Sequence, residues 1–127
     1  RLKGFITTGS ASDYYNKGVE ASCLKYGVEA DDIESFISND IAADGSLSQV
    51  YRQKWVSLFM QGHEAWAEYR RTGEPVLQLP LNALYDVIPY RFYYPESEDL
   101  LNKVNKDRAA DMLSNGDELD SKIWWIQ

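Results

Sequence analysis

Residues 53–75 read QKWVSLFMQGHEAWAEYRRTGEP and carry the clearest helical pattern of the chain. Aromatic, apolar and small residues recur here at steps of three and four, which places them on one helix face: Tyr51, Trp55, Leu58, Gly62, Trp66 and Tyr69. We therefore predict one long helix with both tryptophans in the stripe that faces the core. Its weak point is Gln61-Gly62, where we expect a kink or a break into two.

The ends of this helix are marked by capping signals. Ser46, with Gln49 three residues further on, forms a capping box at the start. Arg70 complements the negative end of the helix dipole, Gly73 suits the left-handed residue that follows a helix, and Pro75 prevents continuation. The long helix should therefore run from about residue 46 to residue 72.

Two shorter helices are predicted upstream of it. Ser10 and Asp13 form a helix-start signature for a helix from about Ser12 to Tyr26, which Gly27 would end. Acidic residues 31 and 32 open a second helix, whose buried side should hold Ile33, Phe36 and Ile37. The segment 38–45, SNDIAADG, has the composition of a loop.

The pattern changes from residue 76 onward. Leucines alternate with other residues and prolines favour extended backbone, so we expect an irregular arm with one short strand pair. Pro95 precedes an acidic first turn of a short helix, and Asn105 is predicted to cap another that ends by Gly116. That last helix should turn three residues inward: Ala109, Met112 and Leu113. The Trp124-Trp125 tail needs a covering surface.

The predicted fold class is all-α, a tetratricopeptide-like helical array fragment with a loop-rich C-terminal arm. We expect residues 1–127 to form a single unit, with a helical scaffold over 1–75 and an irregular arm with short helices over 76–127. A hydrophobic content of 44% and a charged content of 26% are ordinary for a folded domain.

The charge balance argues against one class of partner. The net charge is −7 and the acidic residues are spread along the whole chain, so the surface should repel phosphate backbones. We therefore expect no nucleic-acid partner. Cys23 is the single cysteine, which excludes an internal disulfide and favours a small buried residue.

The sequence offers no catalytic or metal constellation, and we assign no catalytic residue, no metal ligand and no cofactor. His63 is the single histidine and has no cysteine partner that would complete a zinc site, so an exposed helix position is the favoured interpretation. The adjacent pairs Asp31-Asp32 and Glu98-Asp99 suit helix starts better than the facing carboxylates of a glycoside hydrolase. The segment 115–120, NGDELD, is predicted to be a turn because it lacks the calcium-loop spacing.

The aromatic residues of the arm leave two interpretations open. Tyr90, Tyr93 and Tyr94 could present flat faces to sugar rings or pack the arm onto the helices, and packing is favoured. Arg91 is predicted to fasten the arm through an ion pair with a carboxylate such as Glu98.

Ordered motifs along the chain resemble the C-terminal portion of SusD/RagB-like outer-membrane nutrient-binding lipoproteins. The motifs run in the family's order and are Gln53-Lys54-Trp55, Glu64-Ala65-Trp66, Arg70 to Gly73, Ile88-Pro89-Tyr90-Arg91, Tyr94-Pro95 to Glu98, Asn102 or Asn105, and Trp124-Trp125. Each motif is weak alone, and the ordered set is fairly specific. Because family members are several times longer, the resemblance implies that this chain is a fragment with helix faces left uncovered.

The resemblance implies a non-enzymatic function. Family members bind glycans or other nutrients and deliver them to a TonB-dependent (SusC-like) transporter of the outer membrane, to which they are attached as surface-exposed lipoproteins. The anchor would lie outside this fragment, and the remainder of the parent chain would be a partner of its helices. The family's ligand platform is expected mostly outside these residues, so the ligand-binding residues are unknown. The alternative is an independent acidic helical protein-interaction module without a large apolar patch, and a glycoside hydrolase fragment is a third hypothesis.

Overall fold

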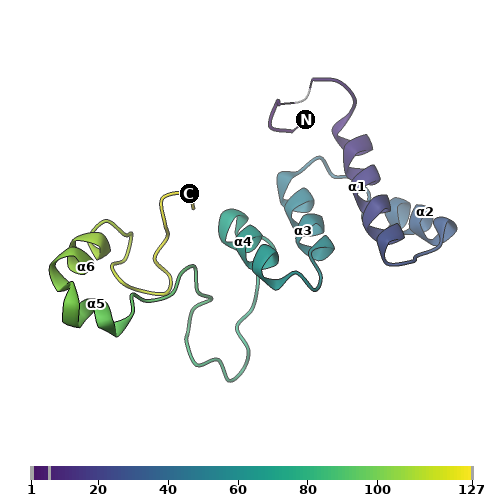
Figure 1. Cartoon of the computed structure of the whole chain (residues 1–127). Helices are drawn as coiled ribbons and strands as arrows, with labels where there is room; N and C mark the ends of the chain where they lie inside the picture. The colour runs from purple at the N-terminus through teal and green to yellow at the C-terminus, as the bar shows by residue number, and fades with distance from the viewer. Residues whose placement is uncertain (1, 6, 127) are drawn as a thin grey trace. The chain divides into compact units, whose positions relative to one another are not determined.

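The computed structural model describes residues 2–5 and 7–126, and all regular secondary structure in this part of the chain is helical. Figure 1 shows the six helices: α1 (Ala11–Lys25), α2 (Ala30–Asn39), α3 (Leu47–Ser57), α4 (Gly62–Thr72), α5 (Glu96–Leu101) and α6 (Lys103–Ala110). The all-α fold class predicted from the sequence is confirmed. The expected strand pair in the arm is wrong, because the described residues form only one isolated bridge, between Ser114 and Gly116.

The chain is organised as two compact units, Arg1–Tyr69 and Arg70–Gln127. The first unit holds α1, α2, α3 and most of α4, and the second holds α5, α6 and the loops around them. The division into a scaffold over 1–75 and an arm over 76–127 stays a prediction.

Helix α1 begins and ends where its capping residues predict. The Ser10 side chain accepts a hydrogen bond from the Asp13 N–H at 3.0 Å, which satisfies one of the free donors of the first turn. At the other end, Gly27 has a φ of 76° and donates to the Leu24 carbonyl, while Val28 donates to that of Cys23. These two bonds form a Schellman motif, in which glycine adopts the left-handed conformation without a Cβ penalty.

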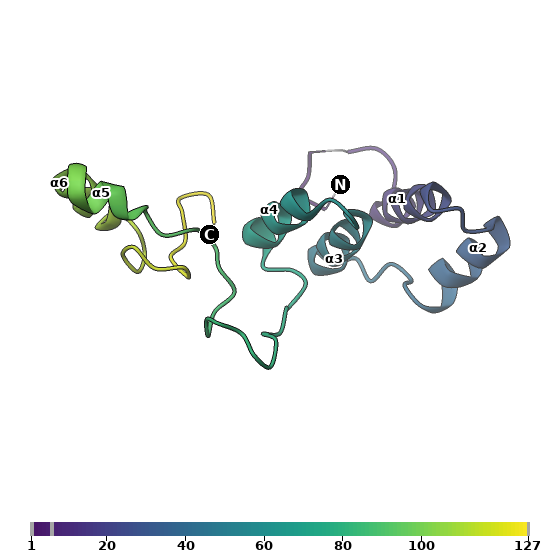
Figure 2. The same cartoon turned by 60° about the horizontal axis from the view of Figure 1, so that its bottom comes forward.

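The core of the first unit lies around α1, which packs against both α2 and α3 (Figures 1 and 2). Tyr15 and Val19 of α1 and Ile33 of α2 are buried. The Tyr15 hydroxyl donates to the Ile41 carbonyl at 3.0 Å and so ties α1 to the segment that follows α2. Helix α2 is longer than expected, because residues 38 and 39 of the predicted loop belong to it.

The predicted buried side of α2 is only partly correct. Ile33 is buried and Ile37 is half-buried, but 37% of Phe36 is exposed. Phe36 reaches a hollow between α1 and α3 instead of the core.

The long helix predicted from residue 46 to residue 72 is interrupted. Its first part, α3, is capped by Ser46, whose side chain accepts from the Gln49 N–H at 3.0 Å. The chain then turns at residues 58–61, where Met60 has a φ of 66° that cannot continue an α-helix. The stripe of six residues is therefore not one continuous face, although the expected break near Gln61-Gly62 is confirmed.

This interruption changes the position of both tryptophans. Trp55 and Trp66 were expected in the core, and each is only half-buried. An ion pair joins the two helices instead: the Lys54 Nζ lies 2.8 Å from the Oε2 of Glu68, a residue that is only 5% exposed. A buried carboxylate needs such a partner, because leaving it unpaired would be costly.

Two short helices of the second unit contact each other. Helix α5 follows Pro95 as predicted, but α6 starts at Lys103 after the N-cap Asn102, so the expected cap at Asn105 is wrong. Asn105 lies within α6 and donates from its side chain to that of Asn102 at 2.6 Å. Met112 follows the end of α6 and is 79% exposed rather than turned inward, because the helix stops before it.

Removal of the Tyr15 hydroxyl tests the link between α1 and the segment after α2. Tyr15→Phe is expected to lower the free energy of unfolding by about 1 kcal/mol, because the Ile41 carbonyl loses its shorter hydrogen bond and keeps only the one from the Gln49 side chain at 3.4 Å. Urea titration followed by far-UV circular dichroism measures the change. The neighbouring Tyr14→Phe is the matched control, since Tyr14 is exposed, and equal losses in the two variants would contradict the role of this bond.

Candidate functional site

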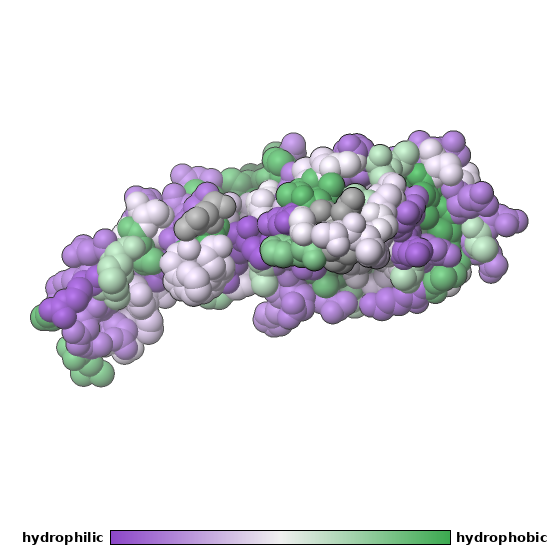
Figure 3. All heavy atoms as spheres, turned by 90° about the horizontal axis from the view of Figure 1, so that it is seen from above, coloured by the Kyte–Doolittle hydropathy of each residue, from purple (hydrophilic) through white to green (hydrophobic). Residues whose placement is uncertain are grey.

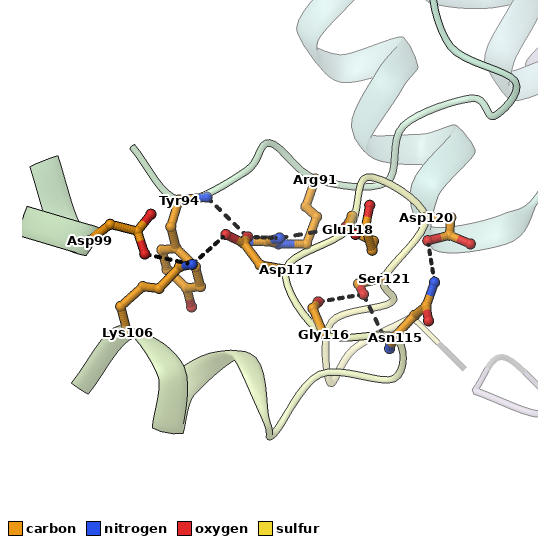
Figure 4. Close-up of polar contacts among 10 residues, drawn as sticks. All are labelled: Arg91, Tyr94, Asp99, Lys106, Asn115, Gly116, Asp117, Glu118, Asp120 and Ser121. Atoms are coloured by element: carbon orange, nitrogen blue, oxygen red, sulfur yellow. Dashed lines mark hydrogen bonds and ion pairs between the residues drawn. The ribbon is translucent and has the colours of Figure 1, made fainter. Parts of the chain in front are cut away.

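Asp117 is the centre of the polar network in the second unit (Figure 4). Its Oδ1 accepts hydrogen bonds from Nη1 of Arg91 at 2.5 Å and from the Tyr94 backbone N–H at 3.0 Å. Its Oδ2 lies 3.5 Å from Nζ of Lys106, which also pairs with Asp99 at 3.1 Å. One carboxylate therefore joins the chain before α5, helix α6 and the turn after it.

The charges around Asp117 determine its protonation. Burial alone would raise the pKa of Asp117, but the hydrogen bonds from Arg91, Tyr94 and Lys106 and the positive charge of Arg91 outweigh burial, so the pKa is lowered. The pKa of Lys106 is raised, mainly by its hydrogen bond to Asp99. Both groups are thus held in their charged forms.

Backbone and hydroxyl contacts hold the turn that carries Asp117. The Ser121 side chain is fully buried; its Oγ donates to the Gly116 carbonyl at 2.7 Å and accepts from the Asn115 N–H at 3.2 Å (Figure 4). The N–H groups of Tyr90 and Arg91 donate to the Leu119 carbonyl at 2.8 and 3.3 Å. The segment 90–94 is therefore fastened to the segment 115–121 at several points.

The sequence predicted that Arg91 forms an ion pair that fastens the arm, but it did not identify the carboxylate. Arg91 pairs with Asp117 rather than with Glu98, whose Oε2 accepts instead from the Asn102 side chain at 2.9 Å. The guanidinium also lies 4.7 Å from the ring centroid of Tyr94. Segment 115–120 was predicted to be a turn, and its role as the holder of the central carboxylate was missed.

The aromatic residues of the second unit differ in exposure. Tyr90 and Tyr94 are half-buried, which fits packing, whereas Tyr93 is 45% exposed. The pKa of Tyr93 is raised by partial desolvation and by the nearby negative charge of Glu118. Trp124 and Trp125 stack edge to face with centroids 5.2 Å apart, and 83% of Trp124 is exposed. Tyr93 and Trp124 thus have ring surface available for contact, whereas the ring of Tyr94 lies against the Arg91 guanidinium.

The remaining residues that the sequence singled out occupy unremarkable positions. His63 is exposed in the first turn of α4. Asp31 and Asp32 lie in the first turn of α2, as do Glu98 and Asp99 in that of α5, so their interpretation as helix-start acids is confirmed. Over residues 2–5 and 7–126, no group of three metal-ligating side chains comes together. None of the helices formed by these residues has the length and apolar character needed to span a bilayer.

The first unit carries a large apolar hollow, which we call the Phe59 groove. Its volume is about 700 Å³, and its main lining residues are Cys23, Tyr26, Trp55, Leu58, Phe59 and Met60. The groove lies between the end of α1, the end of α3 and the turn into α4. On the face drawn in Figure 3, apolar areas likewise reach the surface among the hydrophilic ones.

Comparison with known proteins agrees with this helical arrangement. The model of the SusD-like family, described as starch-binding and associating with the outer membrane, matches residues 2–95. The chain belongs to the SusD-like family. The resemblance drawn from the ordered motifs is confirmed.

Two solved SusD-like structures show how the chain relates to longer members of the family. A SusD homolog from Bacteroides fragilis NCTC 9343 matches with a TM-score of 0.74 and 26% identity, over 99% of this chain and 32% of the other. A structure described as Bacteroidetes AC2a SusD-like matches with a TM-score of 0.80 and 30% identity, over 99% of this chain and 27% of the other. The chain thus spans about a third or less of these relatives. No curated protein matches it.

Substitution of the central carboxylate tests the network. Asp117→Asn is expected to lower the free energy of unfolding at pH 7 by about 1–2 kcal/mol, because the charge-assisted bonds from Arg91 and Tyr94 are weakened. The folded-state pKa of Asp117 is lowered, so its stabilisation is present above the unfolded pKa of about 3.9 and is lost as the pH falls through the folded value.

The difference between the parent and the variant should therefore shrink as the pH falls below about 4. Urea titrations at pH 7 and at low pH measure it. Asp111→Asn removes the same charge at an exposed position and should leave the stability nearly unchanged. An Asp117 variant that behaves like this control at both pH values would show that the network contributes nothing.

Proposed function

We propose that this chain is part of an outer-membrane protein that binds glycans or other nutrients and delivers them to a TonB-dependent, SusC-like transporter. The match of residues 2–95 to a family described as starch-binding and associating with the outer membrane carries this proposal. The protein would be a surface-exposed lipoprotein whose anchor lies outside residues 1–127. Its function would be non-enzymatic: binding and delivery without covalent chemistry.

The contacts of the family motifs support a scaffold role for this part of the protein. Arg91 and the Tyr94 N–H are both engaged by Asp117, and Lys54 is engaged by Glu68. Side chains that satisfy one another inside a unit are not free to bind a sugar hydroxyl. We therefore place most of the ligand platform in segments of the parent chain outside residues 1–127.

The alternative of an independent acidic interaction module is less well supported. Such a module should cover its own apolar surface, because large exposed apolar patches are uncommon on self-sufficient monomers. The Phe59 groove is a hollow of about 700 Å³ lined almost entirely by apolar side chains. That feature fits a piece of a larger body better than a complete module.

The proposal is tested on the protein encoded by the full reading frame. A glycan array identifies a ligand, and isothermal titration calorimetry compares its affinity for the full-length protein and for the 127-residue chain alone. We expect the 127-residue chain to bind at least ten times more weakly, a loss of about 1.4 kcal/mol or more. Co-purification of a TonB-dependent transporter from outer membranes tests the delivery step.

Two aromatic variants of the full-length protein sharpen this test. Tyr93→Ala and Trp124→Ala each remove one of the aromatic rings that the second unit exposes. Each should change the glycan affinity less than twofold if the platform lies elsewhere. A loss of tenfold or more in either variant would instead place the sugar on this unit, and binding of no glycan by the full-length protein would contradict the proposal itself.

A further inference from the structure

The turn that carries Asp117 contains an asparagine followed directly by a glycine, Asn115-Gly116. This is the single Asn-Gly pair in the sequence of 127 residues. Asn115 is exposed and lies in a turn outside the helices of the described chain. Water and solvent bases therefore reach its side chain, and the backbone around it is not held by a helical hydrogen-bond ladder.

The reaction open to this pair is succinimide formation. The Gly116 backbone nitrogen attacks Cγ of Asn115, so that an N–Cγ bond forms and the bond from Cγ to Nδ2 breaks. The proton of the Gly116 N–H passes to solvent, and Nδ2 takes up a proton from water and leaves as ammonia. A water molecule then opens the five-membered ring at either carbonyl, which gives aspartate or isoaspartate. The net change is the uptake of one water and the release of one ammonia, and no oxidant or reductant is consumed.

The backbone at Gly116 suits the attack. Glycine has no Cβ that would hinder the approach of its nitrogen to the preceding side chain, and it adopts the observed φ of 65° without strain. Within residues 2–5 and 7–126, no backbone carbonyl accepts a hydrogen bond from the Gly116 N–H. The attacking nitrogen therefore has no backbone bond to break first.

Several of the other asparagines are followed by an amide that is already engaged. Three of them lie within helices: Asn16, Asn39 and Asn105. The N–H after Asn39 donates to the Phe36 carbonyl at 3.0 Å, and the N–H after Asn105 donates to the Asn102 carbonyl at 3.0 Å. At these positions a helical hydrogen bond must break before the nitrogen can attack.

Asn82 is a matched comparison for Asn115 within the same unit. It is also exposed and also lies in a turn. The next residue, Ala83, carries a Cβ, and its N–H donates to the Pro80 carbonyl at 3.1 Å. The two asparagines thus share their exposure and differ in the residue that must supply the nucleophile.

Conversion to isoaspartate would disturb the contacts that hold this turn. The Asn115 N–H donates to Ser121 Oγ at 3.2 Å, and the same Oγ donates to the Gly116 carbonyl at 2.7 Å (Figure 4). Isoaspartate adds one atom to the main chain between these two groups, because the chain then runs through Cβ and Cγ. Ser121 is fully buried and has little room to follow both groups, so at least one of the two bonds is lost.

Conversion to aspartate would disturb the turn through charge. The Asn115 Nδ2 donates to Asp120 Oδ1 at 3.0 Å (Figure 4). An aspartate at position 115 would place a second carboxylate against this one, and like charges at that distance repel. Both products of the reaction therefore oppose the present conformation of the turn.

We infer that Asn115-Gly116 is a self-modification site, at which succinimide formation converts Asn115 to aspartate and isoaspartate and loosens the turn that holds Asp117. Asp117 Oδ1 accepts from the Tyr94 N–H and from Nη1 of Arg91, so the change at residue 115 weakens the connection between this turn and the chain before α5. The reaction limits the lifetime of this part of the second unit. It needs no ligand and does not depend on the proposed glycan binding.

Ageing of the full-length protein tests the site. The folded protein is incubated in mildly alkaline buffer, which favours loss of the backbone proton, and is then digested beside an unaged sample. Peptide mass spectrometry measures the conversion of amide to acid at Asn115 and at Asn82. Conversion at Asn115 is expected to be faster by on the order of tenfold. Equal rates at the two positions would overturn the proposal.

Amide hydrogen exchange tests the consequence. The Tyr94 N–H reports on the network because it donates to Asp117 at 3.0 Å, and its exchange should be about tenfold faster in the aged protein than in the fresh one. The Val28 N–H of the first unit, which donates to the Cys23 carbonyl at 3.2 Å, is the control and should be unchanged. Unchanged exchange at Tyr94 after conversion, or equal acceleration at Val28, would contradict the inference.

Asn115→Gln supplies the unreactive variant. It keeps a side-chain amide, but attack on the longer side chain would need a less favourable six-membered ring. Fresh and aged samples of this variant should therefore show the same Tyr94 exchange. Acceleration on ageing in Asn115→Gln would assign the loosening to another cause and would overturn the role of residue 115.

Discussion

The structure is governed by a shortage of buried apolar surface. Within the described part of the chain, the buried apolar side chains are Tyr15, Val19, Ile33, Tyr69, Leu119 and Ile126, whereas many more large apolar residues are exposed. Small units bury a lower fraction of their surface than large ones, and this chain is divided into two of them. Each unit therefore depends heavily on polar and capping interactions, such as the Tyr15–Ile41 bond and the Asp117 network.

Polar contacts of this kind determine which conformation a unit adopts more than they increase its stability. Arg91 and Asp117 are 10% and 18% exposed, so their attraction is only partly screened by water, and each charge is satisfied by more than one neighbour. Removal of one partner would leave the others desolvated without compensation. The network thus selects one arrangement of the segments around α5 and α6, in a unit whose buried apolar residues are few.

Local signals in the sequence predicted most of the helix boundaries. Ser10, Gly27 and Ser46 act through hydrogen bonds and backbone conformations that depend on near neighbours, so their roles could be derived from the sequence alone. The long-range partner of Arg91 could not, because several carboxylates were equally plausible and only the fold brings Asp117 to it.

The errors in burial have one common cause. Trp55, Trp66 and Met112 were placed inward because their spacing suits a helix face, and spacing shows that a face exists without showing what covers it. The predicted single stripe also assumed an uninterrupted helix, which the turn at Met60 breaks. Periodicity therefore identified the apolar residues correctly, while their depth depends on which other elements pack against that face.

The left-handed backbone of Met60 implies a compromise between local stability and the presence of a long apolar side chain. Glycine at this position would adopt the same conformation without penalty, and the first unit would be more stable with it. It would also delete a long, adaptable thioether side chain of the kind that fills irregular apolar gaps. Methionine at this position therefore gives up some local stability and leaves an apolar side chain 86% exposed at the surface of the first unit.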